Sequence, residues 1–301
     1  MSAGPHDHVF LGHAHGRNER RTWWVIGLCA AMMVVEIAGG IAYGSIALIA
    51  DGLHMSTHAG AMLLAALAYR YAAAHARDPR FSFGTGKLGD LAGFASAIVL
   101  GGVAVLIGYE SIGRLFAPVP VRFGEAIPLA TLGLAVNAAS AWLLSGGHDH
   151  HHGHDHHHRD NNIRAALVHV VADAAVSGVV IAGLVLGRVF GWRWTDAAAG
   201  LIGAVVIAVW AIGLARDTGA ILLDMTRDPG LADEVRARVA AAGDQVTDLH
   251  LWRLGPGHLS AIVGIETHAA GGGGARDAAW WRARLSDLPA VSHLTVEVTS
   301  A

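Results

Sequence analysis

The chain is poor in cysteine and in charge. Its 301 residues include a single cysteine, Cys29, which excludes an internal disulfide framework and any cysteine-rich zinc or iron–sulfur site. Only 15% of the residues are charged, against about 25% in an ordinary soluble domain, whereas 53% are apolar and the mean hydropathy is +0.43. A formal net charge of -3 argues against a basic face for nucleic acid. The composition therefore favours a chain that meets lipid over much of its length.

Two catalytic motifs are also absent from the sequence. No G-x-x-x-x-G-K-[ST] run is present, so we expect no phosphate-binding loop for ATP. The H-E-x-x-H motif of zinc proteases is missing, because His54 is followed by Met55, and this disfavours an intramembrane metalloprotease. We expect neither enzyme activity nor a resident cofactor. A cleavable signal peptide is not expected either, since the polar start carries scattered His and Arg.

Long apolar windows with few charges predict an α-helical membrane protein with six transmembrane helices, because each window approaches the ~20 residues that a bilayer requires. The expected spans are 23–43, 46–73, 91–115, 126–145, 163–189 and 195–215. Lysine and arginine gather in the loops of one side, which indicates that both termini and the loop 146–161 are cytoplasmic. Glu36 and Glu110 are expected at helix ends or in contacts between spans, and Asp196 is expected to cap the sixth helix.

After residue 223 the sequence becomes typical of a soluble domain. The expected elements are a helix, two strands, a helix and a strand, at 231–242, 246–254, 259–268, 276–288 and 291–298. This α-β-β-α-β order predicts a small two-layer α+β domain. The chain is therefore divided into a histidine-containing cytoplasmic tail, a transmembrane domain and a cytoplasmic domain, at 1–22, 23–223 and 224–301.

Two pairs of side chains with the same spacing lie in the second and fifth spans. His54 and His58 are four residues apart, so both imidazoles lie on one helical face and can bind one cation. His169 and Asp173 have the same spacing. Together they supply three nitrogens and one carboxylate, enough for a four-coordinate metal site between two helices. Simple hydrogen bonds between helices fit less well, because ionisable groups in hydrocarbon are costly and usually mark a site or a pathway.

Further polar residues lie close to these pairs in the sequence. Asp51 is one turn before His54, where it is an outer ligand, an acceptor that orients an imidazole, a proton carrier or a packing group. Asn137, the only amide of the fourth span, either faces the site or joins helices. Lys87 and Asp90, at the start of the third span, form either the ion pair of a cytoplasmic gate or a plain interfacial pair.

Histidine is concentrated in the loop between the fourth and fifth spans. Such a tract forms no core, and its imidazoles can capture divalent cations by exchangeable ligation. The loop histidines are His148, His150, His151, His152, His154, His156, His157 and His158. An engineered tag would lie at a terminus rather than between two spans. In the cytoplasmic domain His250, His268 and Glu297 are further candidate ligands, although exposed histidines are common in soluble domains.

These features together resemble the cation diffusion facilitator family. The residues that carry the resemblance are 50–54, 80–84, 169–173 and 246–252, and the likeness extends over 23–300. It implies a metal/proton antiporter that works as a homodimer, with a ferredoxin-like, metallochaperone-like cytoplasmic domain. Segments 54–58 and 84–94 are similar to the cobalt/nickel-exporting branch, because zinc exporters typically have Asp where His58 stands. Many zinc exporters have His where Ile262 stands, so the resemblance transfers their cytoplasmic metal sites only weakly.

We therefore expect proton-coupled efflux of divalent transition metals across a bacterial inner membrane, which confers metal tolerance. Co²⁺ or Ni²⁺ is the favoured cargo, and the other expected partners are protons, membrane lipid and a second copy of the chain. Neutral imidazoles and ionised Asp173 bind the cation inside, and protons displace it outside. Two alternatives stay open: an exporter of zinc, or of zinc, cadmium and iron, in the same family, and a membrane metal sensor that does not transport.

Overall fold

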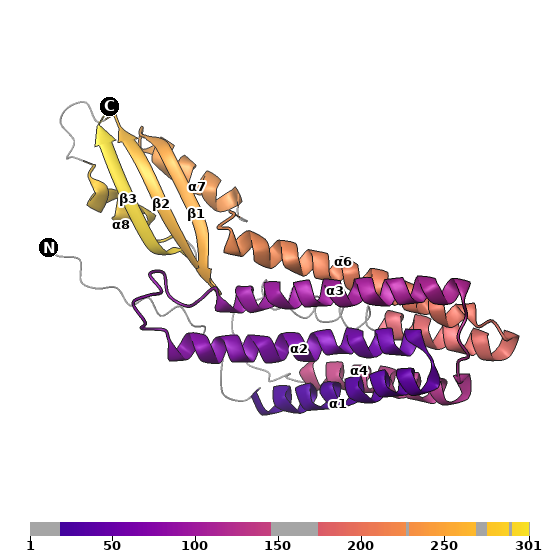
Figure 1. Cartoon of the computed structure of the whole chain (residues 1–301). Helices are drawn as coiled ribbons and strands as arrows, with labels where there is room; N and C mark the ends of the chain where they lie inside the picture. Colours follow the sequence, from indigo (N-terminus) through magenta and orange to yellow (C-terminus); the bar gives the residue numbers. More distant parts are fainter. Residues whose placement is uncertain (1–18, 146–173, 227–228, 269–275, 289–290, 301) are drawn as a thin grey trace. The chain divides into compact units, whose positions relative to one another are not determined.

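The computed structural model describes residues 19–145, 174–226, 229–268, 276–288 and 291–300 (Figure 1). They divide into two compact units. The helical unit contains Ala14–Ala65 and Ala95–Ala215, and the tail unit contains Ala66–Phe94 and Arg216–Ala301.

Helices occupy all the positions where spans are expected. They are α1 (Glu19–Tyr43), α2 (Ile46–Ala74), α3 (Leu88–Phe116), α4 (Phe123–Ser145), the segment Ala174–Phe190 and α6 (Trp194–Leu222) (Figure 1). Within the described residues, α3 and α6 are long and apolar enough to cross a membrane on their own. The described apolar stretches of three other helices are shorter, at Gly27–Tyr43, Ile46–Ser56 and Ala174–Phe190. Helix formation is thus confirmed at five of the expected spans and over 174–189 of the fifth, whose residues 163–173 lie outside the described part of the chain. Six crossings remain a prediction.

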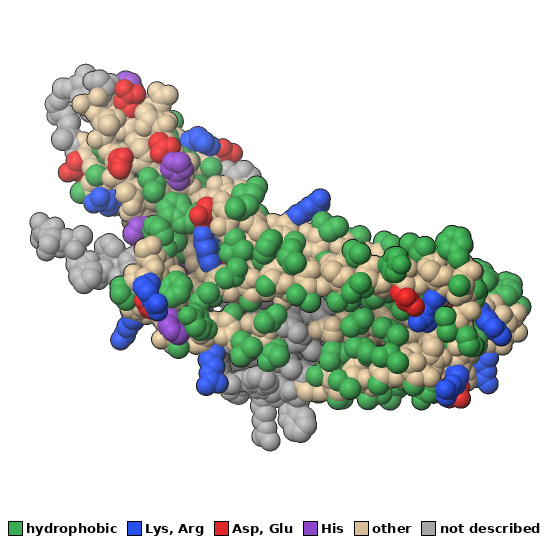
Figure 2. Space-filling view, in the orientation of Figure 1, with side chains coloured by type: hydrophobic (Ala, Val, Ile, Leu, Met, Phe, Trp, Pro, Cys, Tyr) green, Lys and Arg blue, Asp and Glu red, His purple; other side chains and the backbone are tan. Residues whose placement is uncertain are grey.

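Apolar side chains cover much of the outer surface of the helical unit. Val99, Val105 and Val209 are each more than half exposed. On the face drawn in Figure 2, hydrophobic side chains are spread along this unit and charged ones are few. Such a surface is unusual for a soluble domain and fits contact with lipid chains. Glu110 belongs to this exterior, where it accepts a hydrogen bond from Arg114 Nε at 2.9 Å.

The expected role of Asp196 as a cap of its own helix is wrong. Its carboxylate accepts hydrogen bonds from the first amides of α2, at 2.8 Å from Ile46 N and 3.4 Å from Ala47 N. Ser45 Oγ also donates to it at 2.5 Å. The first amides of a helix have no partner within the helix and lie at the positive end of its dipole, so they attract a carboxylate. Asp196 therefore joins the start of α6 to the start of α2.

The tail unit contains the expected α-β-β-α-β order. Its elements are α7 (Pro229–Ala241), β1 (Gln245–Gly255), β2 (His258–Thr267), α8 (Ala278–Leu285) and β3 (Val291–Ser300) (Figure 1). β1 pairs antiparallel with β2, and β2 pairs parallel with β3. The α+β prediction is confirmed. The ferredoxin-like label fits less closely, because β2 and β3 are direct neighbours and no strand separates them as in a split βαβ unit.

One face of this sheet carries the core of the tail unit. Ala261, Val263 and Ile265 alternate along β2 and are buried against α7 and α8. The residues that α7 and α8 contribute recur at helical spacing and are Leu231, Val235, Val239, Trp281 and Leu285. His250 and Trp252 flank the core residue Leu251 on β1, so they lie on the opposite face of the sheet.

Candidate functional site

One of the four predicted metal ligands can be described with its side chain. His54 lies on α2, is 2% exposed, and places its ring 5.8 Å from that of Trp210 on α6 in an edge contact. α2 includes position 58, but the side chain of His58 lies outside the described residues, as do His169 and Asp173. Within the described residues no three His, Cys, Asp or Glu side chains form a metal-binding group. The four-ligand site therefore stays a prediction.

Asp51 joins α2 to the helical segment Ala174–Phe190 of the fifth expected span. Its side chain is fully buried, and Oδ1 accepts a hydrogen bond from Ser177 Oγ at 3.2 Å. Ser177 lies on Ala174–Phe190, four residues after Asp173 in the sequence. The bond therefore brings the face of α2 that carries Asp51 and His54 against the described part of the fifth expected span, at a residue four positions from Asp173 in the sequence. Ser177 was missed by sequence reasoning, although its spacing from Asp173 was a usable signal.

A second buried carboxyl group lies in the same unit. Glu36 on α1 is 0% exposed, and neither of its carboxylate oxygens has a hydrogen-bond partner among the described residues. A Cβ atom added at Gly133 of α4 would lie 1.8 Å from Glu36 Oε1. One added at Gly52 of α2 would lie 3.0 Å from Glu36 Cβ. Of the two expected settings for Glu36, the structure shows the contact between helices.

Asn137, the other residue predicted near the site, is half-buried on α4. The hydrogen bonds formed among the described residues do not link it to Asp51 or His54. Its role at the site therefore stays a prediction.

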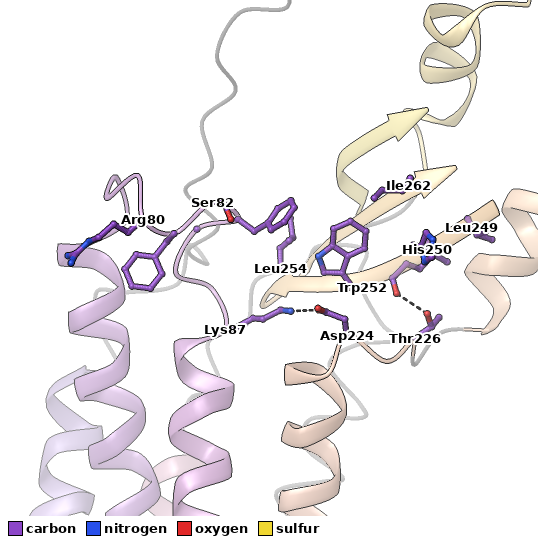
Figure 3. A pocket seen from close by; sticks show the side chains of 14 residues that line it. Arg80, Ser82, Lys87, Asp224, Thr226, Leu249, His250, Trp252, Leu254 and Ile262 are labelled. Carbon is purple, nitrogen blue, oxygen red and sulfur yellow. Dashed lines mark hydrogen bonds and ion pairs between the residues drawn. The ribbon is translucent and has the colours of Figure 1, made fainter. Parts of the chain in front are cut away.

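The tail unit contains a cleft of about 740 Å³ beside the uncovered face of its sheet (Figure 3). Its walls come from the loop before α3, the end of α6 and strands β1 and β2. Phe83 makes an edge contact with Trp252, with ring centroids 5.6 Å apart. Thr226 Oγ1 donates to the carbonyl of Leu251 at 2.8 Å. These contacts hold the loop and the end of α6 against β1 within this unit.

The expected Lys87–Asp90 ion pair is not formed. Lys87 lies on the wall of the cleft and its Nζ pairs with the carboxylate of Asp224 (Figure 3). α3 begins at Leu88, so Asp90 lies in its first turn, whereas Lys87 precedes the helix and is free to extend toward the end of α6. Asp224 has a φ of 56° immediately after α6. In the loop between α2 and α3, hydrogen bonds from Arg80 lower the pKa of Asp78 to about 2.

The candidate ligands of the tail unit do not cluster. His250 Nε2 lies 2.9 Å from Asp248 Oδ2, and both side chains are exposed. His268 is exposed at the end of β2, and its backbone N donates to Asp244 Oδ1 at 3.1 Å. Glu297 is exposed on β3. In the part of the tail that the structure describes, these side chains form no group of three metal ligands.

Known proteins are similar in sequence to most of the chain. The pattern of the cation efflux transmembrane domain matches residues 22–223. The metal cation efflux system protein CzcD of Cupriavidus metallidurans is 31% identical over 291 residues, 95% of this chain and 89% of that protein. The zinc transporter ZitB of Escherichia coli is 33% identical over 259 residues, covering 84% and 79%. The cadmium, cobalt and zinc/H(+)-K(+) antiporter of Bacillus subtilis is 28% identical over 263 residues, covering 86% and 81%.

The chain belongs to the cation diffusion facilitator family and is an integral membrane protein. The expected family membership is thus confirmed, and with it metal-cation efflux as the activity of the relatives. The cobalt/nickel branch stays a prediction, since the relatives' names include zinc, cobalt and cadmium.

Proposed function

We propose that this protein exports divalent transition-metal cations from the cytoplasm in exchange for protons, and that His54, His58, His169 and Asp173 hold the cation. The hydrogen bond between Ser177 and Asp51 carries this proposal. It sets the buried face of α2 against the segment Ala174–Phe190, which adjoins His169 and Asp173 in the sequence. Buried ionisable groups at that place in a metal-efflux family support a transport site.

The chemistry of the four side chains couples metal to protons. Imidazole and carboxylate bind a cation only when they are deprotonated, so metal and protons compete for the same atoms. A cation from the neutral cytoplasm displaces protons from the site. When the site opens to a more acidic outside, protonation of the imidazoles weakens binding and releases the cation. The proton gradient then drives export, and the protein acts as a transporter rather than an enzyme.

Co²⁺ and Ni²⁺ are the cargo that this ligand set favours in our proposal. Three imidazoles and one carboxylate make a site that is richer in nitrogen and less negative than one with Asp at position 58. Zinc is the second candidate, supported by the names of the relatives ZitB and the cadmium, cobalt and zinc antiporter. The same four residues would bind either cargo, and the two alternatives differ only in which metal is transported faster.

The remaining parts of the proposal concern setting and assembly. We place the protein in a bacterial inner membrane as a homodimer with both termini in the cytoplasm. The histidine-rich loop 146–161, which lies outside the described residues, captures cations on the cytoplasmic side.

The test is metal uptake by everted vesicles that contain the full chain and carry an imposed proton gradient. Wild type should accumulate Co²⁺ and Ni²⁺ faster than Zn²⁺ or Mn²⁺, and collapse of the gradient should stop uptake. His169→Ala and Asp173→Ala should abolish uptake at unchanged expression. A non-transporting sensor predicts no uptake in wild type, and near-normal uptake in either variant contradicts the proposed ligands.

A further inference from the structure

Glu36 is a fully buried carboxyl group that the transport cycle described above does not use. It is 0% exposed, and both its oxygens lack hydrogen-bond partners among the described residues. An ionised carboxylate without donors is costly in the interior of any protein, and more so inside a membrane domain. The neutral, protonated acid is therefore the form that this place accommodates.

Three helices enclose this carboxyl group. Gly133 of α4 and Gly52 of α2 both lie against it. Either glycine, replaced by a larger residue, would collide with Glu36 or displace it. The missing side chains therefore leave a space that the glutamate fills. An apolar residue would pack there without the energetic cost of burying an acid. The presence of a glutamate therefore indicates a chemical role.

The charged groups around Glu36 come mainly from α2. Asp51 adjoins Gly52, the α2 residue that packs against Glu36. His54 follows one turn later on the same helix. In α4 the only ionisable residue is Glu125 in the first turn, and Cys29 of α1 is hydrogen-bonded to Ser140 instead. The electrostatic neighbour that matters for Glu36 is thus Asp51, on the face that also carries the predicted metal ligand His54.

We propose that Glu36 is a proton-binding residue of the transport cycle, separate from the metal ligands, and that Asp51 couples its proton to the metal. The inference rests on the proposed proton-coupled efflux. An ionised Asp51 favours a proton on Glu36, because two negative charges repel each other. The two positive charges of a divalent cation at His54 exceed the negative charge of Asp51 and stabilise an ionised Glu36, so the O–H bond of Glu36 breaks and its proton passes to water. By linkage, a proton on Glu36 weakens metal binding by the same factor.

The experiment counts protons released when Co²⁺ binds to the full-length protein in detergent. Calorimetric titrations in buffers of different ionisation enthalpy give this number at each pH. Glu36→Gln keeps the size and neutrality of the protonated side chain but cannot release a proton. The variant should release about one proton fewer per Co²⁺, so its dissociation constant should change about tenfold less per pH unit than that of wild type. Glu125→Gln, an exposed glutamate at the start of α4, is the matched control and should release the wild-type number.

The outcomes separate this inference from the proposed function. A wild-type count in Glu36→Gln overturns the role of Glu36 and leaves proton-coupled efflux intact. Co²⁺ binding to wild type without proton release, together with metal uptake that ignores the proton gradient, overturns both.

A second measurement decides the matter if Glu36→Gln does not fold. The infrared difference spectrum of wild type on adding Co²⁺ should show loss of the C=O stretching band of a protonated carboxylic acid. The band should persist in Asp51→Asn before metal is added, since Glu36 carries it. Absence of the band from wild type overturns the proposal.

Discussion

The two units place the same kinds of side chain in opposite surroundings. In the helical unit Glu36, Asp51 and His54 are buried among helices that are otherwise largely apolar. In the tail unit His250 and His268 stand on the surface, where water solvates them. Electrostatic interactions of a charged side chain are stronger in the buried interior, whereas solvent weakens them at the surface. The proposed metal and proton chemistry is therefore expected to depend on the buried groups of the helical unit more than on the exposed histidines of the tail.

The largest expected difference in metal uptake is between alanine substitutions of a buried and of an exposed histidine. His54→Ala should lower saturated Co²⁺ uptake by more than about 100-fold, because a ligand is lost and a cavity remains. His250→Ala should stay within about twofold of wild type, since its imidazole is exposed. Uptake in everted vesicles at matched expression measures both. Equal losses in the two variants would contradict the contrast between the units.

A second variant sharpens the comparison within the transport site. His58→Asp introduces the carboxylate typical of zinc exporters and should raise the ratio of Zn²⁺ to Co²⁺ uptake by roughly tenfold, a change of about 1.4 kcal/mol in relative binding. Asp has an ordinary pKa of about 3.9 against about 6.5 for His, so metal release should require a more acidic outside. Uptake of Zn²⁺, Co²⁺ and Ni²⁺ across a range of outer pH is the measurement. An unchanged ratio means that position 58 does not select the metal.

A third variant compares acidic residues in the two units by stability. Asp196→Ala removes the carboxylate that binds the first amides of α2, so thermal unfolding should show a loss of about 1–2 kcal/mol. Asp233→Ala in α7 removes a solvent-exposed carboxylate and should change stability by less than about 0.5 kcal/mol. Equal melting temperatures for Asp196→Ala and wild type would show that the cap contributes nothing.

The smallest effect is expected from the histidine-rich loop. Replacing 148–158 by a short Gly/Ser linker should slow uptake only at scarce metal, because the loop concentrates cations without forming the transport site. Saturated uptake should remain near the wild-type rate. A complete loss of saturated uptake with the fold intact would make the loop part of the transport machinery.

Local patterns predicted the elements of both units. The alternation of Ala261, Val263 and Ile265 marks a strand with one buried face, and the spacing of Leu231, Val235 and Val239 marks the helix that covers it. Both patterns depend only on neighbouring residues, so they can be read without knowledge of the fold. The expected strands and helices of the tail accordingly agree with the structure to within a few residues.

Contacts between distant segments could not be predicted in the same way. Asp196 contacts Ile46 across 150 positions and Lys87 pairs with Asp224 across 137. Periodicity shows which face of a helix is apolar but does not identify the helix that packs against it. The sequence reasoning therefore assigned Asp196 to its own helix and Lys87 to Asp90, the nearest partners in the chain. Glu36 was likewise noticed as a charge in a span, while its glycine neighbours on α2 and α4 were not foreseen.

The bond between Asp196 and the first turn of α2 also has a mechanical consequence. With that end held to α6, a tilt of α2 pivots there, and displacement grows with distance from the pivot. His54 lies eight residues along the helix, about 12 Å from the pivot, whereas Ala74 lies about 42 Å away. A tilt of about 10° would move His54 by about 2 Å and Ala74 by about 7 Å. The same rotation would therefore displace the end at Ala74 more than three times as far as the ligand-bearing turn.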